Sequence, residues 1–209
     1  GIYDRDLPYK LVVTGSGSME LKEQIHESLA GRKRVFEMMP VSFLEFVQYK
    51  TNYKYTEKII DFLNIEKANQ KALLDEYLNY GGFPRIVTEE SKEEKLKTID
   101  ELFKSYIEKD IVYLLQIERP EIFKLIIQLI ANQLGYPVNF SSLSKNANVS
   151  VPTLKKYLWY AEKTFSLQKI TPFYTNFRKE ITKSPAYYFT DPGLRNYSLG
   201  LMGNIILND

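Results

Sequence analysis

The stretch from Ser42 to about Leu134 constrains the fold most, because apolar residues recur in it at helical spacing and helix signals follow one another closely. Ser42 and Thr56 are placed to act as N-caps, and Pro120 stands at a favoured first-turn position. The helices expected from these signals cover residues 43–49, 57–63, 66–80, 91–115 and 120–133. A chain with such a middle is expected to fold as a mainly α-helical protein.

The first forty residues are arranged as a strand, a helix and a second strand. Residues 10–14 and 34–38 are short and apolar, and residues 19–30 carry one apolar stripe at helical spacing, ended by Gly31. This order is typical of a βαβ unit, in which the two strands are parallel. Two parallel strands do not make a stable sheet, so we expect this piece to be cut from a longer α/β protein.

The last third of the chain changes character. Residues 140–147 predict a short helix, a turn follows at Asn148, and Ser150 caps a second helix. Two short helices joined by a tight polar turn are typical of a helix-turn-helix. The β-prone segments 167–174 and 186–190 then predict a hairpin, so this region is expected to form a winged helix.

Charge is unevenly distributed along the 209 residues. The whole chain carries 28 basic and 26 acidic side chains, whereas residues 135–209 carry nine basic and four acidic ones. Nucleic acid is therefore expected to contact this third. The candidate DNA contacts lie on the second short helix, facing a major groove, and on the wing, facing phosphates: Thr153, Lys155, Lys156, Arg178 and Lys179.

The same region has a second interpretation, in which the winged helix contacts protein and its lysines are merely solvated. The net charge of residues 135–209 is modest for a DNA-binding module. Trp159 and Tyr160 lie in the same helix as the candidate lysines. We expect both aromatic side chains in the core and not as base-stacking platforms.

Residue types that are rare or missing exclude several chemistries. The chain has no cysteine and a single histidine, His26, which excludes disulfides, thiolate metal sites and multi-histidine metal sites. No apolar run is long enough to span a membrane and no signal peptide opens the chain. We therefore expect no membrane partner, and we expect a cytoplasmic location.

Two motifs near the N-terminus contain residue types that phosphoryl chemistry uses. Residues 14–18 form a turn of glycines and hydroxyl residues after the first strand, at the edge where open α/β sheets bind ligands. Its hydroxyls could contact a phosphate or an attacking water; the alternative is a tight turn without a ligand. No Gly-Lys-Ser or Gly-Lys-Thr occurs in the chain, so the turn is not a P-loop. Arg32 could reach a phosphoryl group across an interface, or it could only complement the dipole of the preceding helix.

Five motifs follow one another along nearly the whole chain. They are Leu11–Ser18, Leu29–Arg32, Phe36–Phe46, Tyr77-Leu78 with Gly81–Pro84, and Tyr188–Asn196. In this order they resemble the prokaryotic AAA-type ATPases, found widely in archaea, whose C-terminal portion is a domain of unknown function.

The resemblance implies roles for individual residues. Thr14 and Ser16 fall at the sensor-1 position of that family, and Arg32 is its arginine-finger candidate, which also implies a homo-oligomer. The element that closes a helical lid near the nucleotide falls on Gly81, Gly82, Phe83 and Pro84. ATP and Mg²⁺ are implied as cofactors of the complete protein, whose Walker A and Walker B residues lie upstream. This chain has neither motif, so the segment alone is expected to bind no ATP and to be inactive.

These expectations define a mixed, mainly α fold. It comprises a truncated α/β core piece of P-loop type (residues 1–50), a helical lid and connector (51–134) and a C-terminal winged helix-turn-helix domain (135–209). The expected function is that of a fragment of an AAA-type ATP-binding protein, which couples nucleotide state to a winged helix that contacts duplex DNA. Two alternatives stay open: a stand-alone winged-helix DNA-binding regulator and a protein-interaction scaffold.

Overall fold

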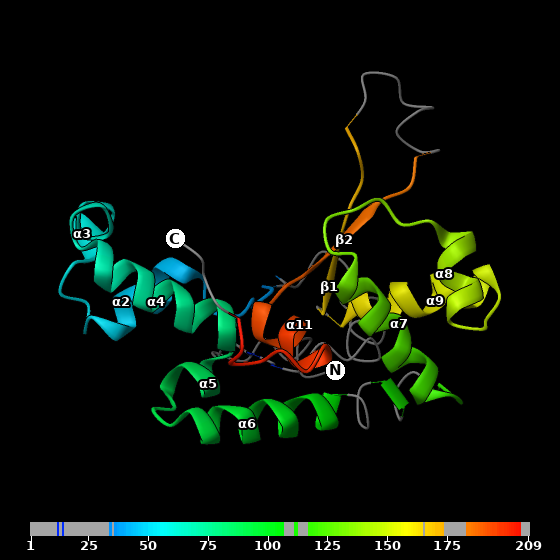
Figure 1. Cartoon of the computed structure of the whole chain (residues 1–209), viewed down its shortest axis with the longest axis horizontal. Helices are drawn as coiled ribbons and strands as arrows, with labels where there is room; N and C mark the ends of the chain where they lie inside the picture. Colours follow the sequence, from blue (N-terminus) through cyan, green and yellow to red (C-terminus); the bar gives the residue numbers. More distant parts are fainter. Residues whose placement is uncertain are drawn as a thin grey trace, which may run out of the picture.

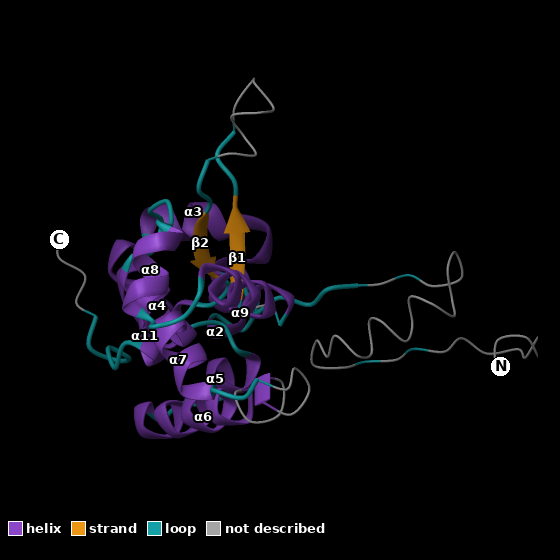
Figure 2. Ribbon diagram, turned by 90° about the vertical axis from the view of Figure 1, so that its right-hand side faces the viewer, coloured by secondary structure: helices purple, strands orange, loops and turns teal. Residues whose placement is uncertain are grey.

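The computed structural model describes residues 12, 14, 34, 36–106, 111–112, 117–164, 166–173 and 183–205. Within these ranges the chain is mainly helical with one two-stranded sheet, as the sequence predicts (Figure 1, Figure 2). The elements are α2 (Phe43–Lys50), η2 (Thr56–Lys58), α3 (Ile59–Ile65), α4 (Lys67–Tyr80), α5 (Pro84–Thr88), α6 (Lys92–Ser105), α7 (Pro120–Asn132), α8 (Phe140–Asn146), α9 (Val151–Lys163), β1 (Leu167–Ile170), β2 (Ala186–Phe189) and α11 (Pro192–Ser198). No helix in these ranges is long and apolar enough to cross a bilayer.

The strand expected at residues 34–38 is not found. The described residues of this stretch adopt no regular secondary structure, and Phe36 and Met38 are 81% and 93% exposed. A strand forms only beside a partner that takes up its backbone hydrogen bonds, and the sheet of the described residues consists of β1 and β2 alone. The prediction of a strand here is therefore wrong, and the rest of the expected βαβ unit lies almost wholly outside the described residues.

A first hydrophobic cluster joins α2, α3, α4 and α5. Ser42 caps α2 as predicted: its backbone N–H donates to the Glu45 carboxylate (2.8 Å), and its hydroxyl accepts from the Glu45 N–H. Thr56 does not cap a helix, because its hydroxyl donates to the Tyr53 carbonyl (2.8 Å) and the 3-10 turn η2 precedes α3. The buried members of this cluster are Phe46, Val47, Ile59, Phe62, Leu63 and Val87.

The largest hydrophobic cluster lies between α7, α8, α9 and the β1–β2 hairpin. Ser150 caps α9 as predicted, since its hydroxyl accepts from the Thr153 N–H (3.2 Å). The two strands pair antiparallel, with Leu167 opposite Phe189. Buried apolar side chains that α7 and α9 contribute include Ile122, Phe123, Ile126, Ile127, Ile130, Leu154 and Leu158.

The end of the long helix predicted near residue 115 lies outside the described residues. The α-helical part, α6, ends at Ser105, and Tyr106 continues it in a π-helical conformation. Residues 111–112 are also π-helical, and residues 107–110 and 113–116 lie outside the described ranges.

Helix α11, which none of the sequence signals predicted, lies between the two halves of the molecule (Figure 1). It packs against α4, α6 and α7. The Tyr197 hydroxyl donates to Asp100 of α6, the Asn196 side-chain amide donates to the Leu78 carbonyl of α4 (2.6 Å), and Arg195 donates to a carbonyl of α7 (3.3 Å). One short helix thus fastens the N-terminal helices to the C-terminal cluster.

Candidate functional site

The structure describes few of the residues expected at the phosphate site. Thr14 is exposed and belongs to no regular element. Ser16 and Arg32 lie outside the described residues, as do Arg178 and Lys179 of the expected wing. The roles expected for these residues stay predictions.

The glycines of the expected lid element lie against Asp191. Gly81 ends α4 with a φ of +83°, and a Cβ atom at this position would lie 2.2 Å from Oδ1 of Asp191. The backbone N–H of Gly82 donates to Oδ2 of Asp191 at 2.6 Å. The contact joins residues 109 positions apart in the sequence. These glycines are therefore required by a close approach between two distant segments.

Asp191 is fully buried and is the N-cap of α11. Its Oδ1 accepts from the Leu194 N–H at 2.9 Å, while its Oδ2 accepts from Gly82. Burial raises the pKa of the Asp191 carboxyl, and the hydrogen bonds from the N–H groups of Gly82, Leu194 and Gly193 offset part of that effect. The carboxylate thus holds the start of α11 against the turn that follows α4.

Two further close approaches tighten this contact. A Cβ atom at Gly82 would lie 2.0 Å from the Val41 carbonyl oxygen, and one at Gly193 would lie 2.1 Å from the Tyr80 carbonyl oxygen. The Val41 N–H donates to the Gly82 carbonyl (2.8 Å), and the Tyr77 hydroxyl donates to the Val41 carbonyl (2.8 Å). Burial and nearby carboxylates raise the pKa of Tyr77 to about 12, so its hydroxyl stays protonated as a donor. We call this arrangement the glycine–aspartate joint, formed by Val41, Gly81, Gly82, Asp191 and Gly193.

The remaining lid residues also contact protein groups. Phe83 is half-buried and packs against the cluster that holds Tyr80 and Ile99, and Pro84 is exposed at the first position of α5. The expected nucleotide contact of Gly81–Pro84 stays a prediction. Asp191 was missed as a site residue, although an aspartate directly before a proline is a typical helix start.

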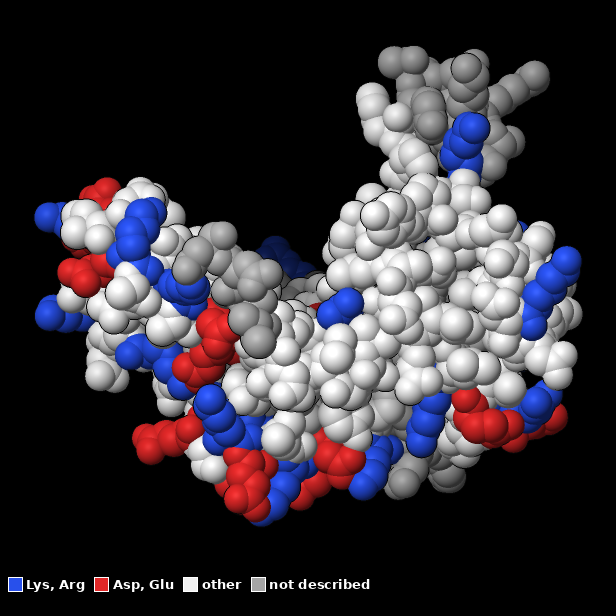
Figure 3. Space-filling view, viewed as in Figure 1, with Lys and Arg blue, Asp and Glu red and all other residues white. Residues whose placement is uncertain are grey.

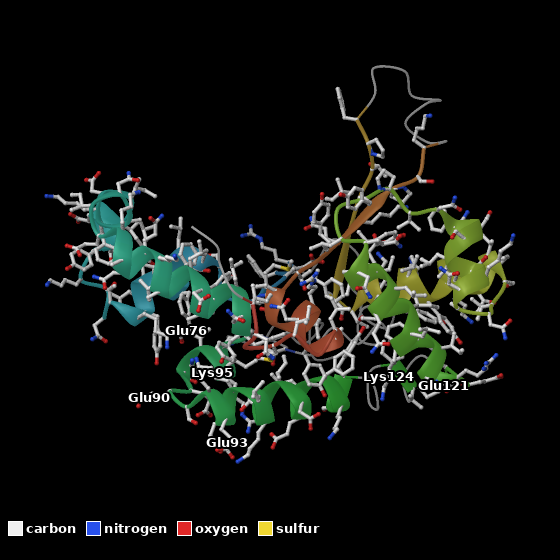
Figure 4. The ribbon with its side chains drawn as sticks, viewed as in Figure 1. Glu76, Glu90, Glu93, Lys95, Glu121 and Lys124 are labelled. Carbon is white, nitrogen blue, oxygen red and sulfur yellow. The ribbon has the colours of Figure 1, made fainter. Side chains whose placement is uncertain are left out.

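An ionic cluster beside the joint connects α2, α4 and α6. Oε1 of Glu76 lies 2.9 Å from the ammonium nitrogens of both Lys50 and Lys95 (Figure 4). Lys95 is 2% exposed and also donates to the Ile86 carbonyl at 3.1 Å. Burial raises the pKa of Glu76, but hydrogen bonds from the two lysines outweigh it, so the pKa lies below its ordinary value.

Two of the three candidate DNA contacts on helix α9 are exposed. Lys155 and Lys156 are exposed, whereas Thr153 is half-buried and its hydroxyl is hydrogen-bonded within the helix cap (2.8 Å). Tyr160 is buried as predicted, but Trp159 is 42% exposed, so its predicted core position is wrong. Trp159 follows Lys155 by four residues, which places both side chains on the same outer face.

Surface charge differs between the two halves of the molecule in the view of Figure 3. Basic and acidic side chains alternate along the lower edge of the α2–α6 half. The surface over α7 and the hairpin is mostly uncharged, with basic side chains scattered at its margin and acidic ones beside them along its lower edge. This view therefore offers no continuous basic surface.

The ATP and Mg²⁺ that the resemblance implies belong to the complete protein. Within the described ranges, no group of three or more histidine, aspartate or glutamate side chains is placed to hold a metal ion. The whole chain also lacks the Gly-Lys-Ser or Gly-Lys-Thr of a phosphate loop. Binding of these cofactors by the complete protein stays a prediction.

Two family profiles match the chain. The profile of a domain of unknown function (DUF8612) matches residues 71–204, well over half of the chain. A profile described as an AAA domain matches residues 1–47, most of which lie outside the described ranges.

Relatives occur in bacteria and archaea. An uncharacterized protein of Haemophilus influenzae is 28% identical over 200 residues, which cover 92% of this chain and 46% of that protein. An uncharacterized protein of Methanocaldococcus jannaschii is 24% identical over 204 residues (95% and 45%), and one of Mycobacterium tuberculosis is 22% identical over 201 residues (96% and 40%). The chain spans less than half the length of these curated relatives. No solved structure matches it.

Proposed function

We propose a function from the premise that this chain belongs to the family of the domain of unknown function DUF8612, whose profile covers residues 71–204. The AAA-domain match over residues 1–47 indicates an ATPase-related origin. We infer that the chain is the transmission part of an AAA-type ATP-binding protein. It couples the nucleotide state of the core to the module formed by α7, α8, α9 and the β1–β2 hairpin.

The glycine–aspartate joint carries this proposal. Val41 lies inside the AAA-matched segment, and its N–H and carbonyl are both hydrogen-bonded to residues of the α4–α5 region. Gly82 then connects that region to Asp191 at the start of α11. Because each glycine contact leaves no room even for a methyl group, we expect a displacement of Val41 to shift the start of α11.

Helix α11 continues the connection into the C-terminal module. It packs against α7 and contacts β2. The joint and α11 thus form a contiguous chain of packed groups from the end of the AAA-matched segment to the hairpin. A continuous connection of this kind supports the proposal, and the variant below tests the coupling itself.

Asp191→Asn in the complete protein tests the coupling. The variant keeps the size of the side chain but replaces one acceptor oxygen with a donor, so one backbone N–H loses its partner. Nucleotide binding is expected to persist, while the response of ATP hydrolysis to DNA is lost. Gly200→Ala is the control, because Gly200 lies outside the joint with nothing within 4 Å of its added Cβ. Hydrolysis that responds to DNA as in the wild type would make the joint purely structural.

The chemistry proposed for the complete protein follows from the resemblance to AAA-type ATPases. Thr14 and Ser16 would occupy the sensor-1 position, and Arg32 would act as an arginine finger toward a neighbouring copy. Arg32→Ala is expected to abolish hydrolysis while nucleotide binding persists, because such a group acts on the transition state. Hydrolysis at the wild-type rate would identify Arg32 as a surface arginine.

The second part of the proposal is that the C-terminal module is a winged helix that contacts DNA. Its elements follow the order helix, helix, helix, strand, strand, which supports this proposal, and α9 would then be the recognition helix. The exposure of Lys155 and Lys156 supports contact with phosphates, and Arg178 and Lys179 would add contacts from the wing. With solvated lysines alone, the same module would contact protein instead, as a protein-interaction scaffold.

Fluorescence anisotropy at two salt concentrations tests DNA contact. Three or four phosphate contacts give a slope of log K against log salt of about −3, and Lys155→Glu/Lys156→Glu should bring it to about −1. Lys58→Glu/Lys67→Glu makes the same charge change on exposed lysines of the other half of the molecule and should change the slope little. DNA binding that is unchanged in Lys155→Glu/Lys156→Glu but weakened in Lys58→Glu/Lys67→Glu would contradict the role of α9.

A further inference from the structure

The outer face of α9 has an aromatic side chain at its centre. Trp159 lies one turn after Lys155 and Lys156 and one turn before Lys163, and all four side chains are exposed. Lys163 Nζ lies 5.9 Å from the centre of a Trp159 ring. Glu162 is the single acidic residue of α9 and is half-buried at the margin of this face. The result is an exposed indole on a helix face that carries three lysines. Lys163 lies over the indole, whereas the ammonium groups of Lys155 and Lys156 lie over the rings of Phe140 and Tyr160 (4.9 and 5.6 Å).

The rest of α9 accounts for its packing without this indole. Leu154, Leu158 and Ala161 are fully buried against the hydrophobic cluster of α7 and the hairpin. Tyr157 and Tyr160 are buried in the same cluster. Trp159 is absent from the buried cluster and its packed neighbours, and its one ring contact with that cluster is to Tyr160 (5.5 Å between ring centres). The apolar core is therefore formed by the other side chains of α9.

We propose that the outer face of α9 binds single-stranded DNA, with Trp159 as the platform on which an unpaired base stacks. The three lysines neutralise the adjacent phosphates, which gives the charge complementarity that such a strand requires. In an intact duplex the faces of the bases are stacked on one another, so an indole cannot reach them without unstacking the duplex, which costs free energy that an unpaired strand does not require. This proposal rests on the DNA contact proposed above and specifies its substrate as an unpaired strand.

The chain carries its own reporter for this contact. Trp159 is the single tryptophan of the sequence, so its intrinsic fluorescence comes from the proposed site alone. A stacked base quenches indole emission. Titration of the full chain with a twenty-nucleotide oligothymidine at low salt should therefore quench most of the fluorescence, and a duplex of the same length should bind at least tenfold more weakly.

Two variants separate stacking from charge. Trp159→Ala should weaken binding of the oligothymidine about tenfold in an anisotropy measurement, as loss of one base–aromatic stack does, and Trp159→Phe should restore part of it. Tyr136→Ala removes an aromatic side chain that is 72% exposed in the loop between α7 and α8. That control should leave the affinity unchanged.

The outcomes distinguish this proposal from the one on which it rests. Salt-dependent DNA binding without fluorescence quenching, or with equal affinity for duplex, would overturn the stacking role while leaving DNA contact by α9 in place. No binding of either DNA at low salt would overturn both. Quenching by oligothymidine together with the loss of affinity in Trp159→Ala would support the proposal.

Discussion

The glycine–aspartate joint and the outer face of α9 represent opposite ways in which a protein uses side chains. At the joint, Asp191 is fully buried and three glycines approach backbone or carboxylate atoms more closely than any Cβ would allow. On α9, Lys155, Lys156 and Trp159 are exposed and pack little against the core. The joint determines how the two halves of the molecule are held, whereas the α9 face determines what the C-terminal half can contact.

This difference separates the measurements that report on each region. A change at the joint removes space or hydrogen-bond acceptors, so it should appear in the free energy of unfolding. A change on α9 alters charge and stacking at a surface, so it should appear in affinity. Substitutions that violate this division would show that one of the two regions has been misinterpreted.

The largest effect is expected from alanine at the joint glycines. Gly82→Ala places a methyl group 2.0 Å from the Val41 carbonyl oxygen, and Gly81→Ala adds a left-handed φ to a contact of 2.2 Å with Asp191. Each should lower the free energy of unfolding by about 3 kcal/mol, measured by urea denaturation. Gly200→Ala shares the left-handed φ but meets nothing within 4 Å, so it should lose only about 1 kcal/mol. Equal losses at Gly81 and Gly200 would mean that the joint is not tightly packed.

An effect of similar size is expected at Asp191. Asp191→Ala leaves the Gly82 and Leu194 N–H groups without their acceptor and should lower the free energy of unfolding by about 3 kcal/mol. Asp191→Asn keeps one acceptor oxygen, so it should lower the free energy of unfolding by about half as much. An unchanged unfolding midpoint for the alanine variant would remove the joint from the proposed transmission path.

The difference in free energy of unfolding between wild type and Asp191→Asn should depend on pH. The pKa of Asp191 is raised in the folded protein, so the folded state binds this proton more tightly than the unfolded state. The contribution of the protonated Asp191 carboxyl to the free energy of unfolding is fully present below its ordinary pKa. That contribution is lost as pH rises through the raised pKa of the folded state. Wild type should therefore gain stability relative to the variant between neutral pH and pH 4 in urea titrations.

The positions of many elements could be predicted from local signals. Ser150 with Pro152 sets the start of α9, and Pro120 sets the start of α7, because caps and first-turn prolines act on neighbouring residues. Which side chains a helix buries depends on what packs against it. Trp159 was therefore assigned to the wrong face, although α9 itself was predicted correctly.

The joint could not be predicted in the same way. Gly81 and Gly82 predicted a turn after α4, which the structure confirms, but their partner Asp191 lies 109 residues away from Gly82. No local pattern connects segments so far apart. The strand expected at residues 34–38 failed for a related reason, because a strand depends on a neighbour that the sequence pattern does not specify.

A smaller effect is expected from the ionic cluster beside the joint. Lys95→Met removes one of two hydrogen bonds to Glu76 and should lower the free energy of unfolding by about 2 kcal/mol at neutral pH. The pKa of Glu76 is lowered in the folded protein, so its contribution is present above the ordinary value and is lost as pH falls through the folded one. The difference in free energy of unfolding between Lys95→Met and wild type should therefore become smaller as pH falls. Lys50→Met is the matched control on the same carboxylate, and it should cost less because Lys50 is more exposed.

The smallest change in stability is expected on α9, where the comparison is sharpest. Lys155→Glu/Lys156→Glu should change the free energy of unfolding by less than about 0.5 kcal/mol, because both side chains are exposed. The only ring contacts at stake are those of Lys155 with Phe140 (4.9 Å) and Lys156 with Tyr160 (5.6 Å), and cation–π contacts at exposed sites contribute little. Urea denaturation of the double variant should thus overlay that of the wild type while its DNA affinity falls. A loss of stability as large as that of Asp191→Ala would show that these lysines support the fold, and the loss of DNA binding could then no longer be assigned to the α9 surface.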